Sequence, residues 1–289
     1  MESPAGRLDA YLAERIPHSR TVIQSMIREG RITVNGTVVA KPAFDLQSGD
    51  AIQVHPIDED PSEKKYEPVT LETVSETNDF VVINKPAGIV VHPSPGHESG
   101  TLAQAVAKHA AEVRGLGEAG REGLVHRLDK DTSGLIIFAK NEATLTLLQD
   151  QFKTRQIEKT YLALVDGHPP SDKGRVEAPI ARDPRNRQRF AVQDAGRSAV
   201  TEFSTQERFE HHSLLHAFPL SGRTHQIRIH MNFLGCPVVG DTVYGRKVPS
   251  LHVKRQQLHA WKLKLPNVDE FEAPIPEDFK DAVRQARQL

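Results

Sequence analysis

The 289-residue sequence contains very little cysteine and no long apolar run. Its single cysteine, Cys236, has no intramolecular disulfide partner and excludes a zinc site made of several cysteines. No segment approaches the roughly 18 consecutive apolar residues of a membrane span. The first residues, MESPAGRLDAYL, lack the charged-then-apolar pattern of a signal peptide. These absences predict a cytoplasmic protein that does not enter a membrane.

Net charge is also nearly absent, because 37 Lys and Arg residues balance 38 Asp and Glu residues. This balance excludes a generic polycationic nucleic-acid binder. The distribution is nevertheless uneven. Residues 69–265 contain 26 basic and 21 acidic residues, a net charge of +5, between acidic segments at 56–68 and 266–289. The composition, 38% hydrophobic and 26% charged, is that of a folded globular protein, and the length favours about two domains.

The order of patterns along the chain predicts two domains of an α+β protein. Residues 1–55 contain two short helical patterns and an Asn-Gly turn between β-branched runs, which predicts a hairpin. Residues 56–68 hold three prolines and seven charges without an apolar period, which predicts an exposed linker. Residues 69–289 place helical patterns at 101–113 and 141–153 among short apolar runs. Strands without strict βαβ alternation favour a mixed, largely antiparallel sheet.

A row of basic residues follows one face of the second predicted helix. Arg20, Arg28 and Arg31 share this face, and Lys41 lies just beyond the predicted hairpin. A basic face of this kind can bind phosphate groups. The spacing alone, however, favours an ordinary solvated helix face.

The small domain resembles a known RNA-binding module over nearly all of residues 5–55. The resemblance is to the S-four (alpha-L) RNA-binding domain and rests on the SR, GRI, VNG, KP and GD elements in their order. In that family, two helices and a hairpin present basic residues to structured RNA. The resemblance therefore implies that Arg20, Arg28, Arg31 and Lys41 contact RNA.

Polar residues gather ahead of an apolar run in the segment LVHRLDKDTSGLIIFAK at 124–140. Its DKDTSG stretch fits the opening of an EF-hand calcium loop, but the twelfth position, which requires a bidentate glutamate, is Lys140. We therefore reject calcium. A second interpretation makes Asp129 a functional carboxylate, because Arg127 and Lys130 beside it favour the ionised form. In a third, Asp129 only caps a turn, and local chemistry alone favours this structural role.

The segment HRLDKDTSGLIIFAK is similar to the signature of the RluA/RluD family of pseudouridine synthases, and further stretches match the same family in the same order. The resemblance is strongest to the RluD-like branch, which acts on large-subunit ribosomal RNA. It implies a pseudouridine synthase catalytic domain at 69–289 whose partner is structured RNA: large-subunit ribosomal RNA or a ribosome assembly intermediate. The further stretches are INKPAGIVVHPSPG at 83–96, TRQIEKTYLALVDG at 154–167, SGRTHQIRIHMNFLGCPVVGDTVYG at 221–245 and QLHAWKL at 257–263.

This resemblance implies roles for the matching residues. Asp129 corresponds to the catalytic aspartate, and Arg228, in THQIR, pairs with it and offsets the cost of a charge in a dry pocket. Tyr161 corresponds to a residue that stacks on the target uracil and assists proton removal at C5. Leu258 corresponds to an apolar wall of the uracil pocket. Because the target base must leave its stack, we expect Arg127 to fill the vacated space or to grip the displaced strand.

Supporting roles are assigned to other residues of the motifs. Asn84 and Lys85 are expected to shape the substrate pocket without taking part in the chemistry, and His126 is expected to support the structure. The THQIR segment predicts a helix with Thr224 as its N-cap and Gly235 as its stop.

Two remaining patterns concern RNA and metal. Four arginines lie within residues 181–189, and a loop carrying Arg185 and Arg187 suits an RNA backbone, with a solvated surface loop as the alternative. Seven histidines between positions 211 and 259 have no HExxH or comparable spacing, so we predict no metal site.

The implied reaction breaks the C1′–N1 bond of a uridine, turns the uracil and rejoins it through C5. It needs no redox equivalent, phosphate donor or metal, so we expect no cofactor, no nucleotide cofactor included, and a monomeric enzyme. Two alternatives stay open: a non-catalytic ribosomal-RNA-binding or assembly factor that keeps the fold, and an enzyme that uses the carboxylate on another glycosidic substrate. Intact Asp129, Tyr161 and Arg228 argue against the first, and the RNA-binding module argues against the second.

Overall fold

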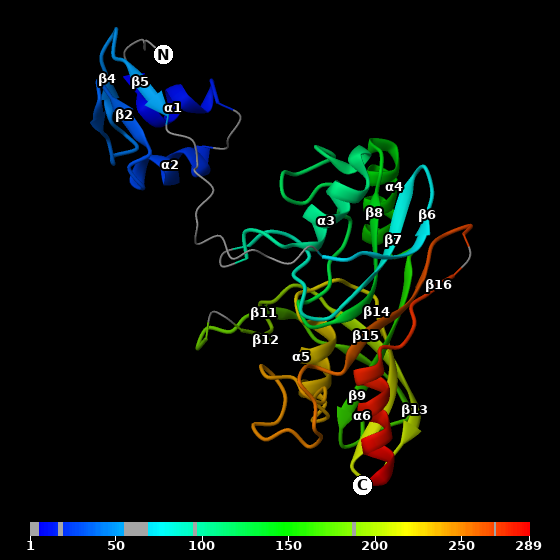
Figure 1. Cartoon of the computed structure of the whole chain (residues 1–289). Coiled ribbons are helices and arrows are strands. Elements are labelled where there is room, and N and C mark those ends of the chain that lie inside the picture. Colours follow the sequence, from blue (N-terminus) through cyan, green and yellow to red (C-terminus); the bar gives the residue numbers. More distant parts are fainter. Residues whose placement is uncertain (1–5, 17–19, 55–68, 95–96, 187–188, 269) are drawn as a thin grey trace. The chain divides into compact units, whose positions relative to one another are not determined.

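The computed structural model divides the chain into two compact units, Met1–Tyr66 and Glu67–Leu289 (Figure 1). The predicted linker at 56–68 lies outside the described residues. None of the helices in the described part of the chain is both long and apolar enough to cross a membrane. The structure describes residues 6–16, 20–54, 69–94, 97–186, 189–268 and 270–289.

The smaller unit packs two helices against short strands. The predicted hairpin is present: Asn35 and Gly36 both have positive φ angles, +50° and +76°, which the tight turn between its strands requires. Leu8, Leu12 and Ile27 lie in the core between the helices and strands. The elements are β1 (Gly6–Arg7), α1 (Leu8–Ala13), α2 (Arg20–Arg28), β2 (Ile32–Val34), β3 (Thr37–Val38), β4 (Asp45–Leu46) and β5 (Ile52–Val54); β2 pairs with β3 and β5, and β1 with β4.

The larger unit is built around a nine-stranded sheet. Its strands are β6 (Glu72–Glu76), β7 (Phe80–Lys85), β8 (Ser133–Ala139), β9 (Glu158–Asp166), β10 (Lys173–Glu177), β13 (Val200–Arg208), β14 (His212–Pro219), β15 (Leu258–Lys264) and β16 (Phe271–Glu272). The order is β10-β13-β14-β9-β15-β8-β7-β6, with β16 beside β15. Every pair is antiparallel except β15 with β8. The predicted α+β class with a mixed, largely antiparallel sheet is confirmed.

Helices cover both faces of this sheet. Along β8, Ile136 and Phe138 enter one hydrophobic cluster with α3, whereas Leu135 and Ile137 enter another with α4. β9 alternates in the same way between α5 and α6. Because side chains alternate across a strand, the helices of each pair lie on opposite faces. The elements outside the sheet are α3 (Leu102–His109), the 3-10 turn η1 (Ala111–Val113), α4 (Glu142–Lys153), α5 (Gln226–Phe233), α6 (Glu277–Gln288) and the separate hairpin of β11 (Ile180–Arg182) and β12 (Phe190–Val192).

A glycine allows the parallel pairing of β8 and β15. Gly134 has φ +111°, and a Cβ at this position would overlap the carbonyl oxygen of Ala260. A side chain there would push the two strands apart. The close approach places the loop before β8, which carries Asp129, beside the first residues of β15 and near β9.

Candidate active site

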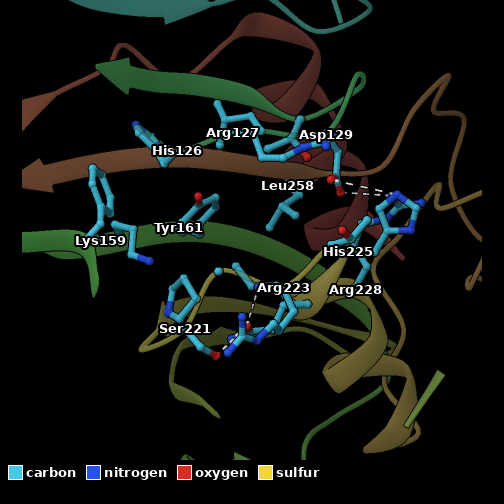
Figure 2. A pocket seen from close by; sticks show the side chains of 18 of the residues that line it. His126, Arg127, Asp129, Lys159, Tyr161, Ser221, Arg223, His225, Arg228 and Leu258 are labelled. Atoms are coloured by element: carbon cyan, nitrogen blue, oxygen red, sulfur yellow. Dashed lines mark hydrogen bonds and ion pairs between the residues drawn. The ribbon is translucent and has the colours of Figure 1, made fainter. Parts of the chain in front are cut away.

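A cavity of about 310 Å³ gathers the sequence motifs of the larger unit. One wall is the loop before β8, with Arg127 and Asp129; the opposite wall is the loop before α5, with Arg223 (Figure 2). Tyr161 of β9 and Leu258 of β15 lie between the two walls (Figure 2). Residues separated by more than a hundred positions in sequence therefore share one cavity.

Asp129 is held by an arginine that a second carboxylate fixes in place. Arg228 of α5 donates through Nη1 to Asp129 Oδ2 at 3.0 Å. The same guanidinium donates through Nε and Nη2 to the two oxygens of Asp241, at 2.6 and 2.9 Å. The N–H groups of Val243 and Tyr244 donate to Asp241 in turn. Arg228 thus reaches Asp129 in a fixed orientation, and the expected ion pair is present.

The environment keeps Arg228 and Asp241 charged. Burial opposes a charged guanidinium, but the hydrogen bonds that Arg228 donates to Asp241 and the negative charges of Asp129 and Asp241 raise the pKa of Arg228 above its ordinary value. Burial likewise opposes the Asp241 carboxylate, yet its hydrogen bond with Arg228 lowers the pKa of Asp241. One arginine is shared by two carboxylates. The group of Asp129, Arg228 and Asp241 therefore has a formal net charge of −1 when all three side chains are ionised. The Asp129 carboxylate is 18% exposed and lines the cavity.

Tyr161 and Leu258 provide an aromatic and an apolar surface beside Asp129. Tyr161 is paired with Ala260 on β15, two residues beyond Leu258, so the two side chains lie on the same face of the sheet. Burial, and to a lesser degree the charge of Asp129, raises the pKa of the Tyr161 hydroxyl. The phenol is therefore neutral at physiological pH. A neutral aromatic face and a leucine suit the stacking of a nucleobase.

His225 was not among the residues singled out from the sequence, although it lies beside Asp129. Its Nε2 is 4.0 Å from Asp129 Oδ1, and its Nδ1 is 2.9 Å from the Tyr244 hydroxyl. It precedes α5 with φ +57°, and it occupies the N-cap position. The prediction of Thr224 as the N-cap was wrong, because the left-handed turn at His225 starts the helix one residue later. Gly235, with φ +78°, follows the helix end as predicted.

His126 has a structural environment. Its Nε2 accepts a hydrogen bond from the N–H of Ile137 at 3.1 Å, and its ring stacks on Phe152 with 4.6 Å between the ring centres. Burial lowers the pKa of His126 to about 3. The imidazole is therefore neutral and occupied as an acceptor. Within the described residues, no group of three or more His, Cys, Asp or Glu side chains is arranged to bind a metal ion.

Two buried basic side chains hold the backbone of the two residues that follow Asp129. Lys85, fully buried, donates to three carbonyl oxygens, those of Pro86, Ile89 and Lys130, at 2.8–2.9 Å, and burial lowers its pKa to about 7. Arg255 donates to the carbonyl of Asp131 and forms an ion pair with Asp278 on α6. Lys85, in the segment INKPAGIVVHPSPG, therefore holds the loop of Asp129 through the Lys130 carbonyl.

The structure does not bring Asn84 into the cavity. Its Nδ2 donates to Glu72 on the neighbouring strand β6 at 2.9 Å, so its assignment to the substrate pocket has no support in the geometry. Lys85 likewise does not line the cavity. It supports the cavity wall by its hydrogen bond to the carbonyl of Lys130, the residue after Asp129. Arg127 does line it. Ser221, where the family commonly has threonine, uses its hydroxyl to accept from the Val200 N–H and to donate to Gln226.

The basic residues assigned to RNA are exposed or half-buried where the structure describes them. Arg28 and Lys41 are exposed, and Arg31 is half-buried and pairs with Glu29 at 3.0 Å. Arg185 is exposed in the loop between β11 and β12. The side chain of Arg20 and all of Arg187 lie outside the described residues.

Comparison with known proteins assigns a family to this chain. The family model described as RNA pseudouridylate synthase matches residues 79–233, and the S4 domain model matches residues 6–52. The chain is 38% identical to the uncharacterized RNA pseudouridine synthase YlyB of Bacillus subtilis, covering 99% of this chain and 96% of the relative. It is 39% identical to the ribosomal large subunit pseudouridine synthase D of Pseudomonas aeruginosa, covering 94% and 89%.

Solved structures agree with this relationship. Human RNA Pseudouridylate Synthase Domain Containing 4 matches with a TM-score of 0.60 and 25% identity, covering 74% of this chain and 92% of that chain. Human RNA Pseudouridylate Synthase Domain Containing 1 matches with a TM-score of 0.59 and 25% identity, covering 77% and 98%. The chain therefore belongs to the RNA pseudouridylate synthase family, whose members are isomerases, and it carries an N-terminal S4 domain.

Proposed function

We propose that this synthase converts specific uridines of large-subunit ribosomal RNA, free or in a ribosome assembly intermediate, to pseudouridine, with Asp129 as the catalytic residue. The observation that carries the proposal is the single carboxylate of the cavity, Asp129, held by Arg228 beside Tyr161 and Leu258. Relatives named ribosomal large subunit pseudouridine synthase D, 38–39% identical over most of the chain, support the choice of RNA.

The arrangement suits the steps of the isomerisation. The target uridine must leave its stack, and Arg127 at the cavity wall is suited to fill the vacated space. The uracil then stacks on Tyr161 against Leu258, with Asp129 beside the sugar and the base. The C1′–N1 bond breaks, the uracil turns, and a C1′–C5 bond forms while the proton on C5 is lost and N1 gains one. Because the atoms of substrate and product are the same, no redox equivalent or phosphate donor is consumed.

The carboxylate can act at the base or at the sugar, and both routes need the same contacts. Arg228 keeps the carboxylate oriented toward the nucleotide, and the neutral phenol of Tyr161 adds no competing negative charge. We propose that residues 1–55 bind structured RNA through Arg20, Arg28, Arg31 and Lys41, that Arg185 and Arg187 follow the RNA backbone, and that residues 69–289 perform the reaction. We further propose that the protein acts as a monomer and, because its substrate is ribosomal RNA, in the cytoplasm.

The test is to map pseudouridines in ribosomal RNA from cells that lack the gene and are complemented with wild type, Asp129→Asn or Asp131→Asn. Asp131 is the matched control, because it receives the same substitution two residues away and does not line the cavity. We expect wild type and Asp131→Asn to restore the modification and Asp129→Asn to reduce it by about 10²–10⁴-fold. Full restoration by Asp129→Asn would refute the catalytic assignment. A deletion strain without any altered uridine would refute the ribosomal-RNA substrate.

A further inference from the structure

The cavity has many more positive side chains than its one carboxylate needs. Arg127, Lys153, Lys159, Arg223 and Arg228 all line it. Arg228 is shared by Asp129 and Asp241, whereas within the described residues the other four form no ion pair. Cations left unpaired around a partly buried site are unfavourable until an anion binds there. The excess therefore indicates an anionic ligand and not only an uncharged base.

Arg223 has a fixed backbone and a free guanidinium edge. Gln226, 4% exposed, accepts from the Arg223 N–H at 3.0 Å and from the Ser221 hydroxyl at 2.7 Å. Its amide donates to the carbonyl of Val200, so the loop is tied to the sheet. The side chain of Arg223 donates through Nε to the carbonyl of Ser198 at 3.0 Å. Both Nη groups are left without a partner among the described residues, and together they form the planar fork that suits phosphate oxygens.

The positive charges of two further arginines act on Arg223. Arg197 is the neighbour of Ser198, on which Arg223 rests, and Arg155 follows α4 two residues after Lys153, which lines the cavity with Arg223. Burial, with the positive charges of Arg197 and Arg155, lowers the pKa of Arg223. Arg155 and Arg197 are exposed and have no carboxylate partner in the described part of the chain. Three arginines from three separate loops therefore bring positive charge to the guanidinium of Arg223.

Arg155 also occupies a backbone position where arginine is unfavourable. It lies just beyond the end of α4 with φ +62°, and the next N–H, that of Gln156, returns to the carbonyl of Gln151 at 2.9 Å. Helices that end in this way usually place glycine at the left-handed residue. A side chain at such a position costs about 1 kcal/mol or more, so its presence favours a function for the side chain over a role in folding.

We propose that Arg155, Arg197 and Arg223 form a subsite for backbone phosphates of the RNA strand on the wall opposite Asp129. This subsite rests on the proposed function, because it holds the strand whose uridine enters the cavity. The uracil lies between Tyr161 and Leu258, and the phosphate beside that nucleotide is bound by the Arg223 fork, with Arg155 and Arg197 at the neighbouring phosphate. The subsite fixes the strand while the base is turned.

The experiment compares two full-length triple variants with the same change of charge. The test variant carries Arg155→Gln, Arg197→Gln and Arg223→Gln. The control carries Arg208→Gln, Arg284→Gln and Arg287→Gln, exposed arginines that pair with Asp172, with Glu277 and Asp281, and with Glu207. Affinity for an unmodified large-subunit ribosomal RNA transcript and for poly(U) is measured by filter retention between 50 and 300 mM KCl.

We expect the slope of log affinity against log salt to become shallower by about 0.7 for each phosphate that the test variant no longer neutralises, a total of about 1–2 for the triple. Affinity at 150 mM KCl should fall by about tenfold or more, while the control keeps the wild-type slope. In turnover assays, Arg155→Gln and Arg197→Gln alone should raise KM and leave kcat within about twofold. An unchanged slope in the test variant on both RNAs, or an equal decrease in the control, overturns the subsite.

The measurement of RNA affinity does not depend on pseudouridine formation, so the subsite and the proposed function can be refuted independently. A wild-type protein that forms no pseudouridine in ribosomal RNA, but shows the slope difference between the triple variants on poly(U), refutes the proposed function and keeps the subsite. A wild-type protein that modifies ribosomal RNA while both variants bind like wild type refutes the subsite and keeps the function.

Discussion

Two arginines that line the cavity differ in how their positive charge is balanced. Arg228 of α5, which holds Asp129, is buried, hydrogen-bonded on two sides and neutralised by two carboxylates. Arg223, in the loop before α5, has one hydrogen bond to a carbonyl and no carboxylate within the described residues. A charge that is already neutralised holds a catalytic group in place without RNA, whereas an unneutralised charge becomes favourable only when an anion arrives. The Asp129–Arg228 pair is thus complete without RNA, whereas the charge of Arg223 is balanced only when the substrate binds.

The strongest test of this comparison is to replace Arg228 and Arg223 separately by methionine. Arg228→Met leaves Asp129 and Asp241 without their cation, so we expect a loss of about 3–5 kcal/mol in the free energy of unfolding. Activity should fall by about 10²–10³-fold. Arg223→Met removes an unpaired charge, so stability should change by no more than about 0.5 kcal/mol while RNA binding weakens.

Both stabilities can be read from urea unfolding followed by the fluorescence of Trp261, the single tryptophan of the sequence, which lies in β15 of the larger unit. Activity is read as the rate of pseudouridine formation. A loss of stability in Arg223→Met as large as that in Arg228→Met would mean that the charges of both arginines are already neutralised within the protein.

A second substitution tests the backbone that positions the Asp129 wall. Gly134→Ala places a Cβ against the Ala260 carbonyl of the parallel strand, where neither backbone can move away easily. We expect a loss of about 2–3 kcal/mol in the free energy of unfolding and a lower kcat. The control is Gly235→Ala, also at a positive φ but with no heavy atom within 4 Å of the added Cβ, which should cost only about 1 kcal/mol. Equal costs measured by urea unfolding would show that the close approach of β8 and β15 is unimportant.

The contrast between these glycines marks what the sequence alone can predict. Local patterns predicted the hairpin at Asn35-Gly36 and the stop at Gly235, because turn geometry depends on adjacent residues. The requirement for glycine at 134 depends on Ala260, which lies far away in sequence. No spacing rule reports such a neighbour.

The same limit applies to the charged residues. The pairing of Arg228 with Asp129 followed from a family resemblance and not from spacing. The second carboxylate on Arg228, Asp241, and the neighbouring His225 both lie in the matching segment 221–245, but the resemblance assigned neither of them a role. Asn84 was assigned to the pocket because it adjoins Lys85 in a motif, but strand alternation turns it toward Glu72 instead.

The smallest predicted effect is a gain in stability, and it concerns Lys159, another cation that lines the cavity without an ion pair in the described residues. Lys159 is half-buried, forms no ion pair within the described residues, and has its ammonium 5.9 Å from the centre of the Phe152 ring. Burial lowers its pKa to about 8. Replacing a half-buried unpaired cation by an apolar side chain of similar length removes that cost, so Lys159→Met should stabilise the RNA-free protein by about 1–2 kcal/mol at pH 7. RNA affinity should fall at the same time.

The pH dependence separates this effect from better packing. Below pH 8 the lysine is charged in both the folded and the unfolded chain, so the cost of burying it is fully present. Between pH 8 and about 10.5 the folded protein releases the proton while the unfolded chain keeps it, so the stability of the wild type rises with pH. The advantage of Lys159→Met over the wild type should therefore shrink from pH 7 to pH 10 in urea unfolding, whereas the exposed control Lys153→Met should differ little at either pH. An advantage that is independent of pH would arise from packing on Phe152, and a loss of stability at pH 7 would mean that Lys159 already has its counter-charge in the protein.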